Sequence, residues 1–237
     1  MTRKIAAKIF QKTAQSNLLI KKEKTEFNTV FFPGCALSST SPELVRKITD
    51  YLGDVNLFTG CCGNPAIQMK DLKSAKKIEN KLVKHLGDYK RILVACPNCY
   101  QVTKRNFPNS EVAFVYEALN PKDFKLEGNY FMHHPCPIRD KETKNKIERF
   151  VVECGLNILD SKSYCCGAKN MMKMLDPEKF KKVNDHANDR LANPLTYCFE
   201  CKENLKGSTH LLELLFHEKT SEISFFTRWA NRFKVSR

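Results

Sequence analysis

The chain has 237 residues, of which 42% are hydrophobic, and a formal net charge of +14. No segment approaches the roughly 18 consecutive apolar residues that a transmembrane helix needs, so we expect no helix to span a bilayer. The first ten residues are interrupted by Lys4 and Lys8 and lack a signal-peptide core, and the cysteine count of 11 is odd. These features argue against a secreted disulfide framework and predict a cytoplasmic protein with reduced thiols.

Most of the excess positive charge lies in the two tails. Residues 1–30 carry +5 and residues 219–237 carry +4, which leaves only +5 for the 188 residues between them. That middle part contains no recognisable nucleic-acid-binding module, so we expect no nucleic-acid partner. The charged side chains of the tails either remain in solvent without a specific partner or help the chain to dock on another molecule.

A basic amphipathic segment, residues 1–28, opens the chain. Its apolar residues are Ile5, Ile9 and Phe10, followed by Leu18–Ile20. Such a segment either packs on its own domain or docks on an acidic partner protein or on the headgroup layer of a membrane.

The first half, residues 29–120, is predicted to alternate strands and helices. A short β-rich run at 29–32 ends at Cys35, and a helix is predicted over 42–52. Ser41 can cap that helix and Gly53 can end it. The further elements expected here are a strand at 55–58, a helix at 70–86 and a strand at 91–95.

The second half, residues 121–217, repeats this order. Strands are expected at 130–132, 156–159 and 195–197, and helices at 141–154 and 177–191. Strand–helix–strand units imply parallel strands, so we predict an α/β fold of two pseudo-symmetric βαβ-type halves.

The last segment, residues 218–237, reads as a basic amphipathic helix. Apolar residues recur at helical spacing and basic residues fall largely elsewhere around the turn. The apolar set is Ile223, Phe226, Ala230 and Phe233, with Phe225 and Trp229 beside it, and the basic set is Arg228, Arg232 and Lys234. This helix either packs on its own domain or docks on an acidic partner or a membrane surface.

Ten of the eleven cysteines form one pattern used twice: a lone Cys, then Cys-Cys-Gly, then Cys-x-x-Cys. The first copy is Cys35, Cys61, Cys62, Cys96 and Cys99, and the second is Cys136, Cys165, Cys166, Cys198 and Cys201. Corresponding members are separated by 101, 104, 104, 102 and 102 residues. This regularity indicates a duplicated half and predicts that the thiols are metal ligands.

The cysteines follow predicted strand ends, where ligands collect in open α/β sheets. We therefore expect each half to gather five thiolates at one site. Gly63 and Gly167 follow the adjacent pairs, where a positive φ would let backbone amides approach the sulfurs closely. We therefore assign both glycines to the cofactor site.

The number of thiols helps to discriminate between cofactors. A structural zinc ion and a cubane iron–sulfur cluster each take four protein ligands, yet each half supplies five. Adjacent cysteines fit one tetrahedral ion badly, because neighbouring side chains of an extended backbone diverge. This favours a multi-iron cluster, while zinc in one or both halves and a free dithiol site stay open.

The double motif resembles the cysteine-rich CCG-domain family, which includes the B subunit of heterodisulfide reductase. Other members belong to glycolate oxidase, lactate-utilisation and anaerobic glycerol-3-phosphate dehydrogenase systems. The resemblance covers roughly residues 29–217 and includes the opening motif at Phe32–Cys35 and the His-x-Pro-Cys element at His133–Cys136.

This resemblance implies two 4Fe-4S-type clusters of non-cubane form, one per half, held by the ten cysteines of the double motif. It further implies an iron–sulfur subunit of a multi-subunit oxidoreductase, which either only relays electrons or, as in heterodisulfide reductase, uses them to reduce a disulfide. Other iron–sulfur or flavin subunits would be its partners, because no nucleotide motif is present. The alternative is a zinc-stabilised interaction module without redox activity.

Three further residues have competing interpretations. Cys154 corresponds to Leu52 of the first half, so we expect a buried core position instead of a ligand. His133 and His134 lie close to Cys136. They either pack and cap the loop, or one of them donates a hydrogen bond to a cluster sulfur or a proton to a leaving thiolate.

Overall fold

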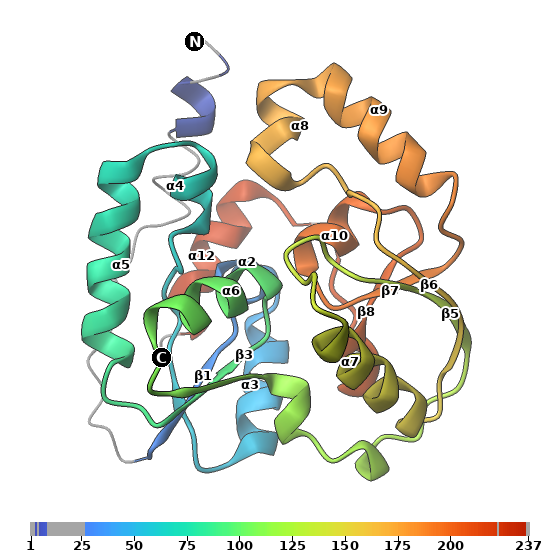
Figure 1. Ribbon diagram of the computed structural model, residues 1–237, viewed down its shortest axis with the longest axis horizontal. Helices are drawn as coiled ribbons and strands as arrows, with labels where there is room; N and C mark the ends of the chain where they lie inside the picture. The colour runs from blue at the N-terminus through green and yellow to red at the C-terminus, as the bar shows by residue number, and fades with distance from the viewer. Residues whose placement is uncertain (1–2, 4, 9–26, 222, 236–237) are drawn as a thin grey trace. The chain divides into compact units, whose positions relative to one another are not determined.

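In the computed structural model, the chain has an α/β architecture with two similar series of strands and helices (Figure 1). The structure describes residues 3, 5–8, 27–221 and 223–235. The chain divides into two compact units: unit 1 is Met1–Val115 with Thr220–Arg237, and unit 2 is Tyr116–Lys219. Each unit holds a four-stranded parallel sheet, which confirms the predicted α/β class with two parallel halves.

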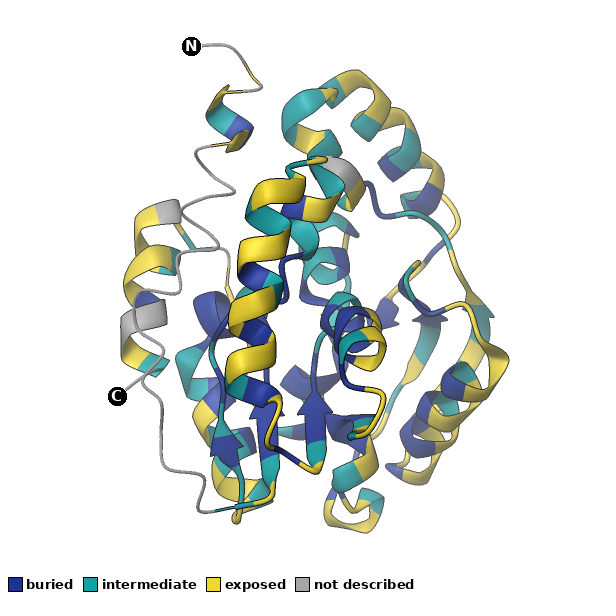
Figure 2. Cartoon of the chain, turned by 60° about the vertical axis from the view of Figure 1, so that its left-hand side comes forward, coloured by how far each residue is buried: buried dark blue, intermediate teal, exposed yellow. Residues whose placement is uncertain are grey.

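The sheet of unit 1 has the strand order β2-β1-β3-β4. Its strands are β1 (Thr29–Phe32), β2 (Asn56–Leu57), β3 (Arg91–Val94) and β4 (Glu111–Phe114). The last three residues of both β1 and β3 are buried, as expected for parallel strands covered on both faces by helices. Figure 2 shows these strands as buried segments and the outward faces of the helices as exposed.

The helices of unit 1 are α2 (Cys35–Thr40), α3 (Pro42–Leu52), α4 (Asn64–Gln68), α5 (Leu72–Leu86), α6 (Pro97–Asn106) and α12 (Phe225–Val235). The predicted bounds of α3 are confirmed. The hydroxyl of Ser41 accepts a hydrogen bond from the backbone N–H of Leu44 at 3.1 Å, and Gly53 ends the helix with a φ of 68°.

Unit 2 repeats this arrangement with the strand order β6-β5-β7-β8. Its strands are β5 (Asn129–His133), β6 (Asn157–Lys162), β7 (Pro194–Thr196) and β8 (Thr209–His210). β5 therefore occupies the place of β1, and β7 that of β3. The equivalence lets positions in the two sheets be compared residue by residue.

The helices of unit 2 are α7 (Lys141–Glu153), α8 (Met172–Leu175), α9 (Pro177–Asn188), α10 (Phe199–Asn204) and α11 (Leu211–Leu215). Short 3-10 turns are η1 (Val115–Ala118, which spans the boundary between the units), η2 (Pro121–Asp123) and η3 (Lys169–Met171). Cys154 follows the last turn of α7 and is buried, which confirms its core assignment, and burial raises its pKa to about 12.

The C-terminal helix α12 packs against α2 and α3 within its own unit. The buried side chain of Asn231 donates a hydrogen bond to the carbonyl of Ser39 at 3.0 Å, and Arg228 Nη1 donates to Thr40 Oγ1 at 3.4 Å. Phe226 is 80% exposed and Trp229 is 42% exposed. Polar contacts thus anchor α12 to its own unit, while its residues Phe226 and Trp229 are exposed.

Residues 9–26 of the N-terminal segment, with Ile9, Phe10 and Leu18–Ile20, lie outside the described residues. In the part of the chain that the structure describes, no helix combines the length and apolarity required to cross a bilayer. The longest helix among the described residues, α5, has 15 residues.

Replacing Asn231 with Ala should destabilise unit 1. The substitution leaves the buried carbonyl of Ser39 without its partner, and we expect a loss of about 1–2 kcal/mol in the free energy of unfolding. Phe226→Ala is the matched control in the same helix, and because this side chain is exposed it should change stability by less than about 0.5 kcal/mol. Urea unfolding measures both; a larger effect of Phe226→Ala would contradict the polar anchoring of α12.

Candidate metal centres

The five cysteines of the first motif lie at the carboxyl ends of three adjacent strands. Cys35 follows β1 and begins α2, and Cys61 and Cys62 lie in the loop after β2. Cys96 follows β3 as the N-cap of α6, and Cys99 lies in the first turn of that helix. Because parallel strands end at the same edge of a sheet, these segments meet there.

The thiols of this first site contact one another in a continuous series. Cys61 hydrogen-bonds with Cys35 and Cys62, Cys62 also with Cys99, and Cys99 with Cys96. Five cysteines spread over 65 residues of sequence are thus brought into one group. Cys61, Cys62 and Cys99 are buried, and Cys35 and Cys96 are partly exposed.

The close packing of these sulfurs changes their acidity unequally. Hydrogen bonds from Cys61 and Cys99 lower the pKa of Cys62 to about 6. The pKa of Cys99 is raised by its hydrogen bonds to Cys62 and Cys96 and by burial. Near neutral pH one buried thiol is therefore readily ionised, and the thiolate is the form that binds metals.

Two glycines permit this close approach. Gly34, with a φ of 83°, lies so near the Cys-x-x-Cys turn that a Cβ atom on it would come within 2.9 Å of Cys96 Cβ and 3.2 Å of Cys99 Sγ. Gly63 also has a φ of 83°, and its backbone N–H donates to Cys61 Sγ at 3.3 Å. The amide-to-sulfur approach expected after the adjacent pair is therefore present in the first half.

The second motif forms an equivalent group in unit 2. Cys166 Sγ and Cys201 Sγ are 3.3 Å apart, and Cys201 also hydrogen-bonds with Cys198. Partial burial raises the pKa of Cys136 to about 11, and the neighbouring charges of Cys165, Cys166 and Cys198 add to this rise. Cys136 is nevertheless the one exposed thiol among the ten motif cysteines.

Gly167, the counterpart of Gly63, has a φ of 85°. A Cβ atom at this position would come within 2.5 Å of the ring of Phe180. The turn after the second adjacent pair therefore packs directly on α9. In the same region, the side-chain amide of Asn184 donates to the carbonyls of Cys166 and Asn204, at 3.0 and 2.7 Å.

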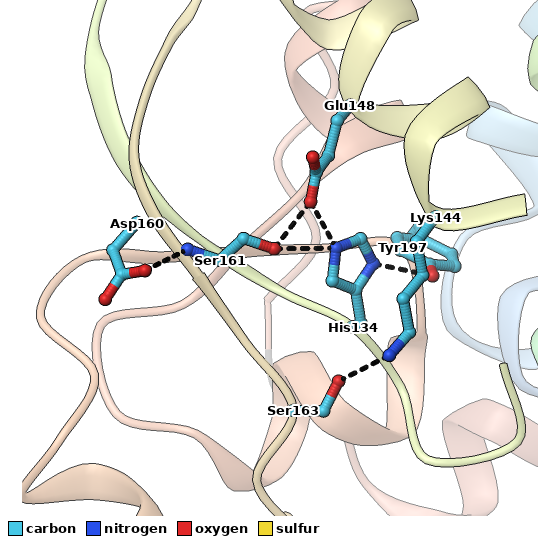
Figure 3. A network of polar contacts seen from close by, with 7 residues as sticks. All are labelled: His134, Lys144, Glu148, Asp160, Ser161, Ser163 and Tyr197. Atoms are coloured by element: carbon cyan, nitrogen blue, oxygen red, sulfur yellow. Dashed lines mark hydrogen bonds and ion pairs between the residues drawn. The ribbon is translucent and has the colours of Figure 1, made fainter. Parts of the chain in front are cut away.

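A network of polar side chains supports the segments that precede Cys136 and Cys198 (Figure 3). Nδ1 of His134 lies 3.0 Å from Tyr197 Oη, and its Nε2 lies 2.6 Å from Glu148 Oε1 and 2.9 Å from Ser161 Oγ. Glu148 comes from α7 and Ser161 from β6, and Tyr197 directly follows β7. The network thus ties three elements of unit 2 to the residue two places before Cys136.

Both ring nitrogens of His134 are occupied by these contacts. Burial lowers its pKa and the neighbouring Glu148 opposes that shift only in part, so the ring is neutral near pH 7. Of the two interpretations given above, the packing and capping role fits His134. Glu148, Ser161 and Tyr197 were not identified from the sequence, because no motif marks them.

The donor set fits a thiolate-bound cofactor. Each unit collects five sulfurs at one sheet edge, and thiolates are the ligands of iron–sulfur clusters and of structural zinc. Within residues 27–221 and 223–235, no three His, Cys, Asp or Glu side chains are arranged to hold a single metal ion. Instead, the five thiols of the first motif contact one another, as do those of Cys166, Cys198 and Cys201 in unit 2.

Two comparisons with known proteins bear on this site. The sequence profile of the CCG family, described as a cysteine-rich domain, matches residues 29–103 and 130–205, which include all ten motif cysteines. The chain is also similar to the B subunit of fumarate reductase (CoM/CoB) from Methanothermobacter marburgensis. Identity is 22% over 202 residues, covering 75% of this chain and 41% of the relative. The chain thus spans less than half the length of this curated relative.

Replacing Gly34 with Ala should selectively damage the first centre. The new methyl group would collide with Cys96 Cβ, so we expect loss of about half of the metal bound by the chain after reconstitution. Gly53→Ala is a matched control, because its φ of 68° imposes similar backbone strain while nothing lies within 4 Å of the added atom. Metal content per chain measures the difference; equal metal binding by both variants would contradict the proposed position of the first centre.

Proposed function

Because the chain belongs to the CCG family of cysteine-rich domains, we propose that it is the iron–sulfur subunit of a multi-subunit oxidoreductase. The similarity to a reductase subunit supports an iron–sulfur redox role in general. The single observation that carries the proposal is the convergence of five thiols at the same sheet edge in each unit.

We assign one 4Fe-4S-type cluster of non-cubane form to each unit. The ligands of the first would be Cys35, Cys61, Cys62, Cys96 and Cys99, and those of the second Cys136, Cys165, Cys166, Cys198 and Cys201. When bound, such clusters would supply one-electron redox chemistry.

The protein's own residues would hold and tune these groups. Gly63 and Gly167 would bring backbone N–H groups toward sulfur, which stabilises added negative charge. The His134 network would fix the segments before Cys136 and Cys198. Buried surroundings exclude water from most of the thiols.

The exposed position of Cys136 favours unit 2 as the place where an electron acceptor approaches. If that acceptor is a disulfide, its reduction consumes two electrons and two protons, breaks the S–S bond and releases two thiols. The electrons would come from another iron–sulfur or flavin subunit, since this chain shows no nucleotide-binding motif. We place this complex in the cytoplasm.

We assign the docking of such a subunit to α12. Its exposed residues Phe226 and Trp229 lie in a helix that also carries Arg228 and the exposed Lys234. An apolar surface flanked by positive charge fits an acidic surface on a partner protein. Because the related protein is named as one subunit of a reductase, we favour a protein partner over anionic lipid.

A zinc-stabilised interaction module is the second candidate, since structural zinc is also held by Cys-x-x-Cys turns. It would use the same thiols without redox activity. The fifth cysteine in each unit favours iron, because structural zinc takes four ligands.

Anaerobic expression and reconstitution should yield a brown protein with sulfur-to-iron charge-transfer absorption and iron in both units. We expect about eight iron atoms per chain for two four-iron clusters. Iron, sulfide and zinc analysis measures this, and Cys62→Ser and Cys166→Ser should each remove about half of the iron. About two zinc ions and no iron at full occupancy would reject the redox proposal in favour of the zinc module.

Replacing the exposed aromatic residues of α12 with Ser, in the double variant Phe226→Ser and Trp229→Ser, should weaken subunit association at least about tenfold and leave the iron content unchanged. Association with the subunits co-purified from the native host is measured by sedimentation or surface binding at two salt concentrations. The control is Val152→Ser, which alters an exposed apolar residue outside α12, in unit 2. If the double variant associates with the other subunits as the wild type does, or if α12 is found to bind anionic vesicles instead of these subunits, the assignment of α12 as the docking helix is contradicted.

A further inference from the structure

One cross-strand row in the sheet of unit 2 consists entirely of polar residues. His133 on β5 is in register with Thr196 on β7, and Thr196 is in register with His210 on β8. All three residues are fully buried. Residues in register on neighbouring strands project from the same face of the sheet, so the three side chains form one row.

Several polar atoms of this row have no hydrogen-bond partner among the described residues. They are both ring nitrogens of His133, the hydroxyl of Thr196 and Nε2 of His210. His210 is partly accounted for, because its Nδ1 accepts from the backbone N–H of Leu212 at 3.2 Å. His133 and Thr196 have no such contact, and burying polar groups without partners costs free energy.

Unit 1 shows what the same positions hold when no polar group is needed. Phe32 on β1 is in register with Val94 on β3, and Val94 with Phe114 on β4. These residues are also fully buried, and they occupy the places of His133, Thr196 and His210 in the duplicated sheet. The fold therefore accepts an apolar row here, so the polar row of unit 2 requires a separate explanation.

The polar row lies on the face of the sheet that meets the second group of thiols. Phe131 shares this face with His133, because alternate residues of a strand point the same way. Phe131 packs against a buried cluster that includes Cys166, Cys198 and Cys201. The ring of His210 stacks on Phe199, between Cys198 and Cys201 in sequence, with 3.9 Å between ring centroids.

We propose that His133 and Thr196 donate hydrogen bonds to the sulfur atoms of the group bound by the second set of thiols, and thereby make this centre easier to reduce than the first. The inference rests on the proposed iron–sulfur function. It assigns a tuning role to two residues that are not ligands and distinguishes the two centres, whose ligand sets are the same.

The physical effect has a definite sign. A donor directed at a cluster sulfur stabilises the more negative, reduced state and so shifts the reduction potential upward. Burial lowers the pKa of His133 to about 4, with a smaller contribution from His134, so the imidazole is neutral and keeps one N–H to donate. The first centre has Phe32 and Val94 in these places, and neither side chain can donate a hydrogen bond.

The test exchanges residues between the two units of the full chain. Thr196→Val and His133→Phe introduce the residues of unit 1 into unit 2, and Val94→Thr is the reciprocal control. The reduction potential of each centre is measured by spectroscopically monitored titration of the reconstituted protein, together with iron content. Pulsed hyperfine spectroscopy in H₂O and D₂O reports exchangeable protons near each centre.

In wild-type protein we expect two different potentials. Thr196→Val and His133→Phe should shift the higher one to more negative values, leave the lower one in place and remove a strongly coupled exchangeable proton. Val94→Thr should shift the lower potential upward. In metal-free protein, Thr196→Val should leave the melting temperature unchanged or raise it, because the hydroxyl has no partner among the described residues. This measurement separates a role in tuning the potential from a role in stabilising the fold.

The outcomes distinguish this proposal from the function on which it rests. If iron is bound but neither Thr196→Val nor His133→Phe moves a potential, the hydrogen-bond proposal is overturned and the redox function stands. If wild-type protein binds no iron, both fail. If the His133→Phe variant loses iron, the potential of the Thr196→Val variant decides whether the hydrogen-bond proposal holds. Valine has almost the same shape as threonine, so this substitution removes only the buried hydroxyl.

Discussion

Parallel strand pairing is the constraint on which both candidate centres depend. In a parallel sheet every strand delivers its following loop to the same edge, so β1, β2 and β3 bring Cys35, the Cys61-Cys62 pair and the Cys96 turn together from distant parts of the sequence. Thiols placed in this way contact each other, and three of the five are buried, so the release of a proton from one thiol depends on its neighbours.

The two units use one backbone plan with different polar surroundings. In unit 2, the residues before Cys136 and Cys198 belong to the network of His134, Glu148, Ser161 and Tyr197, and His133 and Thr196 lie on the other face of the sheet. Phe32 and Val94 stand at the corresponding positions of unit 1. A duplicated set of cysteines therefore does not imply that a bound group would have the same potential in both units, since potentials depend on hydrogen bonding and solvent exposure as much as on ligands.

The sequence predicted most of this framework, because local rules decide much of it. Capping by Ser41 and the stop at Gly53 define α3 correctly, and the repeated cysteine pattern identifies the duplication. Helix α6 was not predicted, because it begins at the Cys-x-x-Cys turn without a side-chain cap, and strand β4 was not predicted either. The partners of His134 and the anchoring of α12 by Asn231 depend on tertiary contacts that periodicity does not reveal.

The return of the chain to unit 1 affects how the molecule is made. Unit 2 is one continuous segment, whereas unit 1 receives α12 only after unit 2 has been synthesised. During translation unit 2 can close around its own core before α12 has been synthesised, and only afterwards can Asn231 bind Ser39 and bring α12 against α2 and α3. Removing α12 would therefore destabilise unit 1, although the main part of unit 1 lies before unit 2 in the sequence.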